Sequence, residues 1–162
     1  MKVVVLISGR GSNLRSLIEA QVGGQLSAEI VKVISNVPDA PGLEIAKSHG
    51  VRSEVINHKD FDSQKNFEDA LNKALILADI DLICLAGFMR ILSDNFVNKW
   101  KDRLINIHPS LLPSFKGLNT HERALKAGVR FTGCTIHFVR VAMDDGPIIL
   151  QAAIPTLAQD TP

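Results

Sequence analysis

An asparagine and a histidine stand two residues apart near the middle of the chain, in the segment Asn-Ile-His-Pro. The run that leads into them, Leu104 to Ile107, is apolar and predicts a β-strand, in which residues two apart share a face. A carboxamide N–H can stabilise the oxyanion of a tetrahedral intermediate, and an imidazole can transfer protons. Asn106 and His108 therefore predict acyl chemistry, with a merely structural histidine beside a turn as the alternative.

Asp144 is the carboxylate that could assist this histidine. It belongs to the segment Asp-Asp-Gly-Pro at 144–147. A carboxylate near His108 would favour the imidazolium form and make the ring a better acid at neutral pH. Because Asp, Gly and Pro also form ordinary turns, a solvated turn is the alternative.

A glycine-containing loop, Ser8 to Asn13, follows the first apolar run. Glycines at a strand-to-helix junction let several backbone N–H groups face an anion, and the helix N-terminus adds positive potential. The Walker A ending is missing, and the dinucleotide fingerprint fails because Leu14 stands at the third glycine position. We expect one phosphate monoester here, and a plain turn capped by Ser12 or Asn13 is the alternative.

A second candidate binding segment, Phe88 to Leu92, is an apolar loop with one cation, Arg90. At the carboxyl edge of a parallel sheet such a loop could wall a flat aromatic ligand. Packing of its apolar side chains in the core is the alternative.

Short β-branched runs alternate with helical patterns, which is typical of βαβ units. We expect an α/β fold: an open, mostly parallel Rossmann-like sheet with helices on both faces and an antiparallel extension near the C-terminus. The expected strands are 2–8, 29–35, 52–56, 81–86 and 104–107, with the extension at 133–139 and 148–155; the expected helices are 13–20, 42–49 and 63–78.

The charge balance excludes several classes of partner. Eighteen Lys and Arg against seventeen Asp and Glu leave a net charge of +1 on 162 residues, without the excess expected of a nucleic-acid or membrane-surface binder. With no run of about 18 apolar residues, we expect a cytoplasmic protein without nucleic-acid or membrane partners. Cys84 and Cys134 lie in apolar runs, as buried free thiols do, and no His or Cys spacing predicts a metal site.

Four segments in the same order resemble the phosphoribosylglycinamide formyltransferases, a folate-dependent formyltransferase family of purine biosynthesis: residues 6–14, 85–92, 106–113 and 144–149. The resemblance covers almost the whole chain. It implies transfer of a formyl group from the co-substrate 10-formyltetrahydrofolate to the primary amine of glycinamide ribonucleotide, without a metal.

The resemblance also implies roles for individual residues. Asn106 would stabilise the oxyanion, His108 would be the general acid and base, and Asp144 would tune the histidine. The substrate phosphate would bind the glycine loop at Gly11, Ser12 and Asn13. The folate pterin would lie against two segments, through Met89, Arg90, Ile91, Leu92, Arg140 and Val141.

The chain departs from the family at two places. Gln64 stands where the family often places a basic residue near the folate tail, although Lys65 follows it. Family members also continue into a helical region, and Asp160-Thr161-Pro162 resembles a helix start. We therefore expect a single domain over residues 1–162 that lacks a C-terminal helical tail, as a monomer or a homodimer.

Three other functions compete with this one. A formyltetrahydrofolate hydrolase would use similar Asn, His and Asp residues with water as the acceptor, but that family carries an additional regulatory domain. Methionyl-tRNA formyltransferases share the Asn-x-His-Pro segment but need an RNA-binding domain. A non-catalytic phosphate-binding module would use the glycine loop alone, with His108 structural.

Overall fold

The computed structural model describes residues 1–162, which divide into a first unit, residues 1–104, and a second unit, residues 105–162. The first unit contains four parallel strands in the order β3-β2-β1-β4. Its elements are β1 (Lys2–Ile7), α1 (Ser12–Val22), β2 (Glu29–Ser35), α2 (Gly42–Ser48), β3 (Ser53–Val55), η1 (His58–Asp60), α3 (Gln64–Leu77), β4 (Leu82–Leu85) and α4 (Asp94–Lys99).

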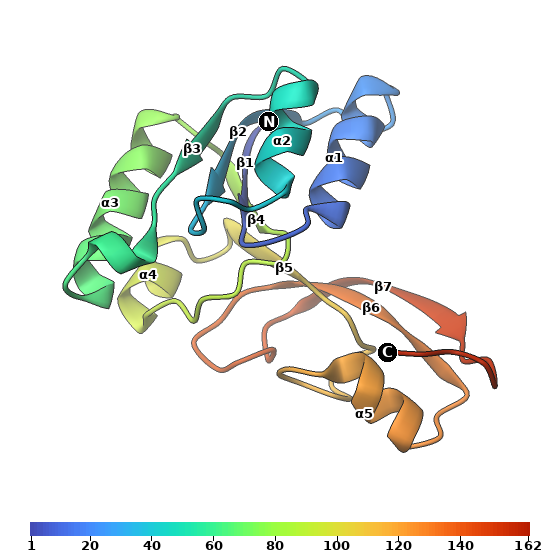
Figure 1. Cartoon of the computed structure of the whole chain (residues 1–162). Coiled ribbons are helices and arrows are strands. Elements are labelled where there is room, and N and C mark those ends of the chain that lie inside the picture. Colours follow the sequence, from blue (N-terminus) through green and yellow to red (C-terminus); the bar gives the residue numbers. More distant parts are fainter. The chain divides into compact units, whose positions relative to one another are not determined.

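The central strand β1 is buried on both faces, which explains its continuous apolar run. Its odd-numbered residues, such as Val5, join one apolar cluster with Leu14 and Ile18 of α1 and Ala46 of α2. Val4 and Leu6 are fully buried on the other face. Figure 1 shows α3 on the opposite side of these strands from α1 and α2. The predicted parallel sheet with helices on both faces is therefore present in the first unit.

Serine caps begin the helices α3 and α4. The Ser63 hydroxyl accepts a hydrogen bond from the Asn66 N–H at the start of α3, and the Ser93 hydroxyl accepts one from the Phe96 N–H at the start of α4. Such caps satisfy N–H groups that the helix itself leaves unpaired. The helix α3 was expected over 63–78 and is confirmed, whereas α4 has only six residues and too few turns to give a periodic sequence pattern.

The second unit is built on an antiparallel sheet in the order β5-β6-β7. The strand β5 (Leu104–His108) leads into it, and α5 (Thr120–Lys126), β6 (Phe131–Phe138) and β7 (Ile148–Pro155) follow. β7 occupies the residues expected for the last strand, so the predicted antiparallel extension is confirmed. The short helix α5 was not expected from the sequence.

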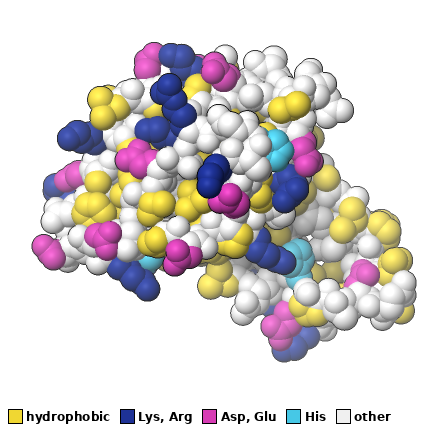
Figure 2. Space-filling model, turned by 45° about the horizontal axis from the view of Figure 1, so that its top comes forward, with side chains coloured by type: hydrophobic (Ala, Val, Ile, Leu, Met, Phe, Trp, Pro, Cys, Tyr) yellow, Lys and Arg dark blue, Asp and Glu magenta, His cyan; other side chains and the backbone are white.

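No helix of the structure is long and apolar enough to cross a membrane. On the face drawn in Figure 2, basic and acidic side chains are interspersed, with hydrophobic side chains between them. Both cysteines are free thiols, and burial raises the pKa of the Cys84 thiol to about 11. A thiol of that pKa stays protonated near neutral pH and is a poor nucleophile.

Candidate active site

Strands β5 and β6 bring three of the polar side chains together. Asn106 and His108 lie two residues apart on β5, and the antiparallel register pairs Asn106 with His137 of β6. Paired residues of neighbouring strands project from the same face of a sheet. The Asn106 Nδ2 group lies 3.3 Å from Nε2 of His137. The sheet thus presents an amide and two imidazoles on one face.

Asp144 meets both imidazoles. Its Oδ2 lies 3.4 Å from Nδ1 of His108, and its Oδ1 lies 3.8 Å from Nε2 of His137. The Gly117 N–H donates to Oδ2 at 2.8 Å and helps to fix the carboxylate. Asp144 has a φ of 50°, a left-handed conformation that Asp tolerates better than most residues. The structure thus gathers the three residues that the sequence proposed for catalysis, Asn106, His108 and Asp144.

The contacts of His108 suit a doubly protonated ring. Its Nε2 faces the Phe115 carbonyl oxygen at 3.0 Å, and its Nδ1 faces the Asp144 carboxylate. Both partners are hydrogen-bond acceptors, so each ring nitrogen of His108 faces an acceptor. His108 is only 5% exposed, which protects these contacts from competing water.

The contacts of His137 suit the neutral ring. Its Nδ1–H donates to the Phe138 carbonyl oxygen at 3.0 Å, which leaves Nε2 to accept from Asn106. His137 is 2% exposed. Burial lowers the pKa of His137 below 6.5, and the neighbouring Asp144 charge only partly opposes this shift. Asp144 thus lies near both imidazoles, and burial favours the neutral form of one of them, His137.

A role for His137 was not predicted from the sequence. The residue pattern predicted a strand at 133–139 but not its pairing with the strand at 104–107. An antiparallel register that placed residue 137 opposite Asn106 would have been the signal, and such a register cannot be read from residue types alone.

A buried threonine holds the chain that follows His108. The Thr135 hydroxyl donates to the Ser110 carbonyl oxygen at 2.7 Å and accepts from the Leu112 N–H at 3.0 Å. The Gln151 amide donates to the same hydroxyl at 3.0 Å. Thr135 and Ser110 are fully buried. Hydrogen bonds therefore fix the turn between Pro109 and Pro113.

The glycine loop of the first unit has the geometry of an anion cradle. Gly11 has a φ of 75°, and a Cβ on it would lie 2.7 Å from the Gly42 Cα, so only glycine fits. No side chain caps the start of α1, and the alternative of a turn capped by Ser12 or Asn13 is not observed. Both of those residues are exposed. The first N–H groups of α1 have no side-chain acceptor and are available to an anion.

Two apolar side chains of the segment from Met89 to Leu92 are exposed, whereas Leu92 is half-buried. Met89 is 69% exposed and Ile91 is 73% exposed. The Met89 N–H donates to the Ser8 hydroxyl at 2.7 Å, and that hydroxyl donates to Asn36 at 2.5 Å. The alternative of core packing therefore does not hold for Met89 and Ile91, which face solvent on a backbone fixed by hydrogen bonds.

The remaining predicted residues lie as follows. In the second unit, the Arg140 guanidinium donates to the Val139 carbonyl oxygen at 2.9 Å, and Val141 is 51% exposed. In the first unit, the Gln64 amide donates to Glu68 and to the Ile91 carbonyl oxygen. Lys65 forms an exposed ion pair with Asp69 at 2.6 Å, so its charge is already partly engaged.

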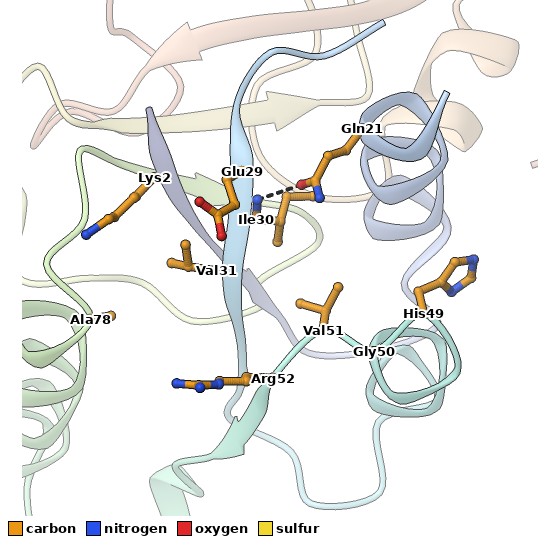
Figure 3. Close-up of a pocket in the computed structure, with 10 residues that line it drawn as sticks. All are labelled: Lys2, Gln21, Glu29, Ile30, Val31, His49, Gly50, Val51, Arg52 and Ala78. Carbon is orange, nitrogen blue, oxygen red and sulfur yellow. Dashed lines mark hydrogen bonds between the residues drawn. The ribbon is translucent and has the colours of Figure 1, made fainter. Parts of the chain in front are cut away.

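A cavity of about 510 Å³ in the first unit lies away from these residues. Figure 3 shows its lining at the amino ends of the strands, with Lys2, Glu29 and Arg52 around it and Gln21 hydrogen-bonded to the Ile30 N–H. Open α/β sheets bind their ligands at the carboxyl ends of the strands. The glycine loop and the Met89 segment lie at those ends, and the cavity does not. No three His, Cys, Asp or Glu side chains are arranged to hold a metal ion.

The chain is similar to proteins of known family. The formyl transferase family model matches residues 1–162. A human protein, the trifunctional purine biosynthetic protein adenosine-3, is 52% identical over 99% of this chain, which spans 16% of that protein. The phosphoribosylglycinamide formyltransferase of Escherichia coli is 44% identical over 99% of this chain, which spans 76% of it.

The fold agrees with a solved structure. A crystal structure of glycinamide ribonucleotide transformylase 1 from Symbiobacterium toebii matches with a TM-score of 0.96 and 42% identity, over 99% of this chain and 76% of that one. The fold class expected from the sequence is confirmed.

Proposed function

The chain belongs to the formyl transferase family, and we propose that it transfers the formyl group of 10-formyltetrahydrofolate to the primary amine of glycinamide ribonucleotide in purine biosynthesis. The observation that carries this proposal is the position of Asp144 between His108 and His137, with Asn106 beside them. Relatives 43% and 44% identical to this chain are named phosphoribosylglycinamide formyltransferase, which supports the choice of acceptor.

The roles of the residues follow from their protonation states. The amine nitrogen bonds to the formyl carbon, whose oxygen becomes negatively charged. Asn106 donates an N–H to that oxygen, and the His108 imidazolium donates from Nε2, exchanging the neutral Phe115 carbonyl for a charged acceptor. Asp144 stabilises the imidazolium through Nδ1. His108 then gives its Nε2 proton to the folate nitrogen as the bond from that nitrogen to the formyl carbon breaks, and the neutral ring takes up the proton lost by the attacking amine.

His137 keeps Asn106 in position in this proposal. A neutral imidazole that accepts at Nε2 binds one N–H of the amide, which orients the carboxamide and leaves its second N–H for the substrate. A charged His137 could not accept this bond. Burial of His137 therefore supports the oxyanion role of Asn106.

The binding residues would act through backbone and apolar surface. The ribonucleotide phosphate would bind N–H groups of Gly11, Ser12 and Asn13. The pterin would contact Met89, Arg90, Ile91 and Leu92 in the first unit, while Arg140 and Val141 remain predictions from the sequence. We keep Gln64 as a weaker candidate for the folate tail, because its amide is engaged with Glu68 and Ile91.

Deformylation of 10-formyltetrahydrofolate, followed by absorbance with and without glycinamide ribonucleotide, tests the proposal. We expect cofactor loss only when the ribonucleotide is present, with one formyl group recovered on its amine. Equal loss without the ribonucleotide would show that water is the acceptor and that the protein is a hydrolase. Phosphate-dependent binding without any formyl transfer would support the alternative of a non-catalytic phosphate-binding module.

A further inference from the structure

Three polar residues follow one another at intervals of four along α3. Gln64, Glu68 and Asn72 therefore share one face of this helix. Each binds the segment that runs from the Met89 loop through α4. In chain order, Gln64 binds Ile91, Glu68 binds Ser93, and Asn72 binds Trp100.

Glu68 is the centre of this row. It is 5% exposed, although it carries a carboxylate. One oxygen accepts from the Ser93 N–H at 2.7 Å and from the Gln64 amide at 2.9 Å, and the other accepts from the Ser93 hydroxyl. A buried carboxylate without a cation is stable only when donors surround it. Glu68 thus binds the residue that caps α4 by both its backbone and its side chain.

Gln64 and Asn72, on either side of Glu68, form further hydrogen bonds to the same segment. The Gln64 amide donates to the Ile91 carbonyl oxygen at 3.0 Å. The Trp100 indole N–H donates to Asn72 at 2.8 Å. The far end of the loop is fixed separately, because the Met89 N–H binds Ser8. The segment between these attachments has no regular secondary structure of its own, so side chains from other elements determine its path.

We infer that Glu68, assisted by Gln64, is a positioning residue that holds Ile91 to Ser93 so that exposed Met89 and Ile91 form a preorganised surface for the folate ring. The inference rests on the proposed function for the identity of the ligand. It assigns Gln64 to holding the loop rather than to contacting the folate tail. If a loop adopts its binding-competent form only part of the time, the apparent affinity for the ligand falls in proportion to that fraction.

The test compares Glu68→Ala and Gln64→Ala with Asp69→Ala, an exposed residue of the same helix that pairs only with Lys65. For Glu68→Ala we expect faster hydrogen exchange of the Ser93 amide and the neighbouring loop amides. We also expect the KM for 10-formyltetrahydrofolate to rise about tenfold, as it would if the loop were competent about a tenth of the time. The KM for the ribonucleotide and kcat should stay within about twofold.

Two further variants separate positioning from general damage. Gln64→Ala releases Ile91 and removes one donor from Glu68 but leaves both hydrogen bonds between Glu68 and Ser93, so it should shift the folate KM in the same direction by less. Glu68→Gln keeps an oxygen for the Ser93 N–H and should recover part of the affinity. A fall in kcat together with a rise in both KM values in Glu68→Ala would indicate a merely structural role and overturn the inference. Unchanged hydrogen exchange and an unchanged KM for 10-formyltetrahydrofolate would also overturn it.

Calorimetric titration with a non-reacting 10-formylfolate analogue distinguishes this inference from the proposed function. Absence of formyl transfer by the wild-type protein would refute the proposed function alone. Weaker analogue binding by Glu68→Ala than by Asp69→Ala would still support the positioning role, and equal binding by the two variants would refute it.

Discussion

The two units of the molecule have interiors of different chemistry. Between residues 1 and 104 the buried side chains are mostly aliphatic, and Val4, Val5, Leu6 and Ile7 are completely inaccessible. Between residues 105 and 162 only Leu112 and Ala124 are buried hydrophobic residues, whereas a larger set of buried residues is polar: His108, Ser110, Thr120, Thr135 and His137. The first interior excludes water, and the second is a hydrogen-bonded network.

This difference separates two ways of building a functional surface. In the first unit, a rigid apolar sheet supports loops that offer backbone N–H groups and exposed apolar side chains, which can bind ligands without titrating. In the second unit, we propose that the side chains themselves transfer protons, and buried hydrogen bonds hold them in place. We expect substitutions in the first unit to affect binding and those in the second to affect turnover.

The largest expected effect is the loss of turnover in His108→Ala and Asp144→Ala. Each removes a group that stabilises charge in the transition state, and such groups are each worth about 10²- to 10³-fold in kcat. Steady-state kinetics of formyl transfer measures the loss, and circular dichroism checks that each variant is folded.

Asp145→Ala is the matched control for Asp144→Ala. Asp145 is the adjacent carboxylate, exposed and paired with Lys116, and it should change kcat by less than about threefold, since an exposed ion pair contributes little. Near-wild-type turnover in either His108→Ala or Asp144→Ala would refute the role assigned to that residue.

A smaller effect, on binding, is expected for Gly11→Ala. A side chain at this left-handed position would strain the backbone and approach Gly42. The KM for the ribonucleotide should rise about tenfold, which corresponds to about 1.4 kcal/mol. Gly9→Ala is the control, because a Cβ there would meet no atom within 4 Å. Equal KM values for the two variants would argue against the phosphate cradle.

A reciprocal pair of substitutions compares the two interiors directly. Thr135→Val removes a buried hydroxyl and leaves the Ser110 carbonyl oxygen and the Leu112 N–H without their partner. Val5→Thr places a hydroxyl in the apolar interior of the first unit. Both should lower the free energy of unfolding by about 1–3 kcal/mol, for opposite reasons. Urea titration measures both, and a neutral result for Thr135→Val would contradict the description of the second interior.

The smallest expected effect is a dependence of stability on pH. Burial lowers the pKa of folded His137 below its ordinary value of 6.5, so the unfolded chain binds the proton more readily. The contribution of this group is fully present above about pH 6.5 and is lost as the pH falls through the lowered folded pKa.

Thermal unfolding between pH 7.5 and 5 tests this dependence. His137→Asn keeps a donor for the Phe138 carbonyl oxygen and should flatten the acid side of the profile. His121→Asn, a change at an exposed histidine, should leave the profile as in the wild type. Identical profiles for wild type and His137→Asn would show that His137 is not held neutral by burial.

The sequence predicted those parts of the fold that local patterns determine. The apolar run of β1, the stripe of α3 and the alternation of strands with helices follow from burial on one or both faces. The short helices α4 and α5 were not predicted, because six or seven residues do not establish a period. The catalytic candidates were found because Asn106 and His108 are two residues apart and Asp144 lies in a distinctive motif.

The remaining features depend on contacts between distant residues. The place of His137 depends on strand register. The partner of Nε2 of His108 is the Phe115 carbonyl oxygen, a backbone group whose position cannot be predicted from residue types. The row formed by Gln64, Glu68 and Asn72 has a regular spacing, but its meaning depends on which segment packs against that face of α3.

The most direct test of the division between binding and turnover is a single-turnover experiment with both substrates saturating. The proposal predicts that Gly11→Ala reaches nearly the wild-type rate of formyl transfer once the ribonucleotide saturates it. Asp144→Ala should remain slower by about 10²-fold or more at any substrate concentration. Recovery of Asp144→Ala at saturation, or a persistent defect in Gly11→Ala, would contradict the division.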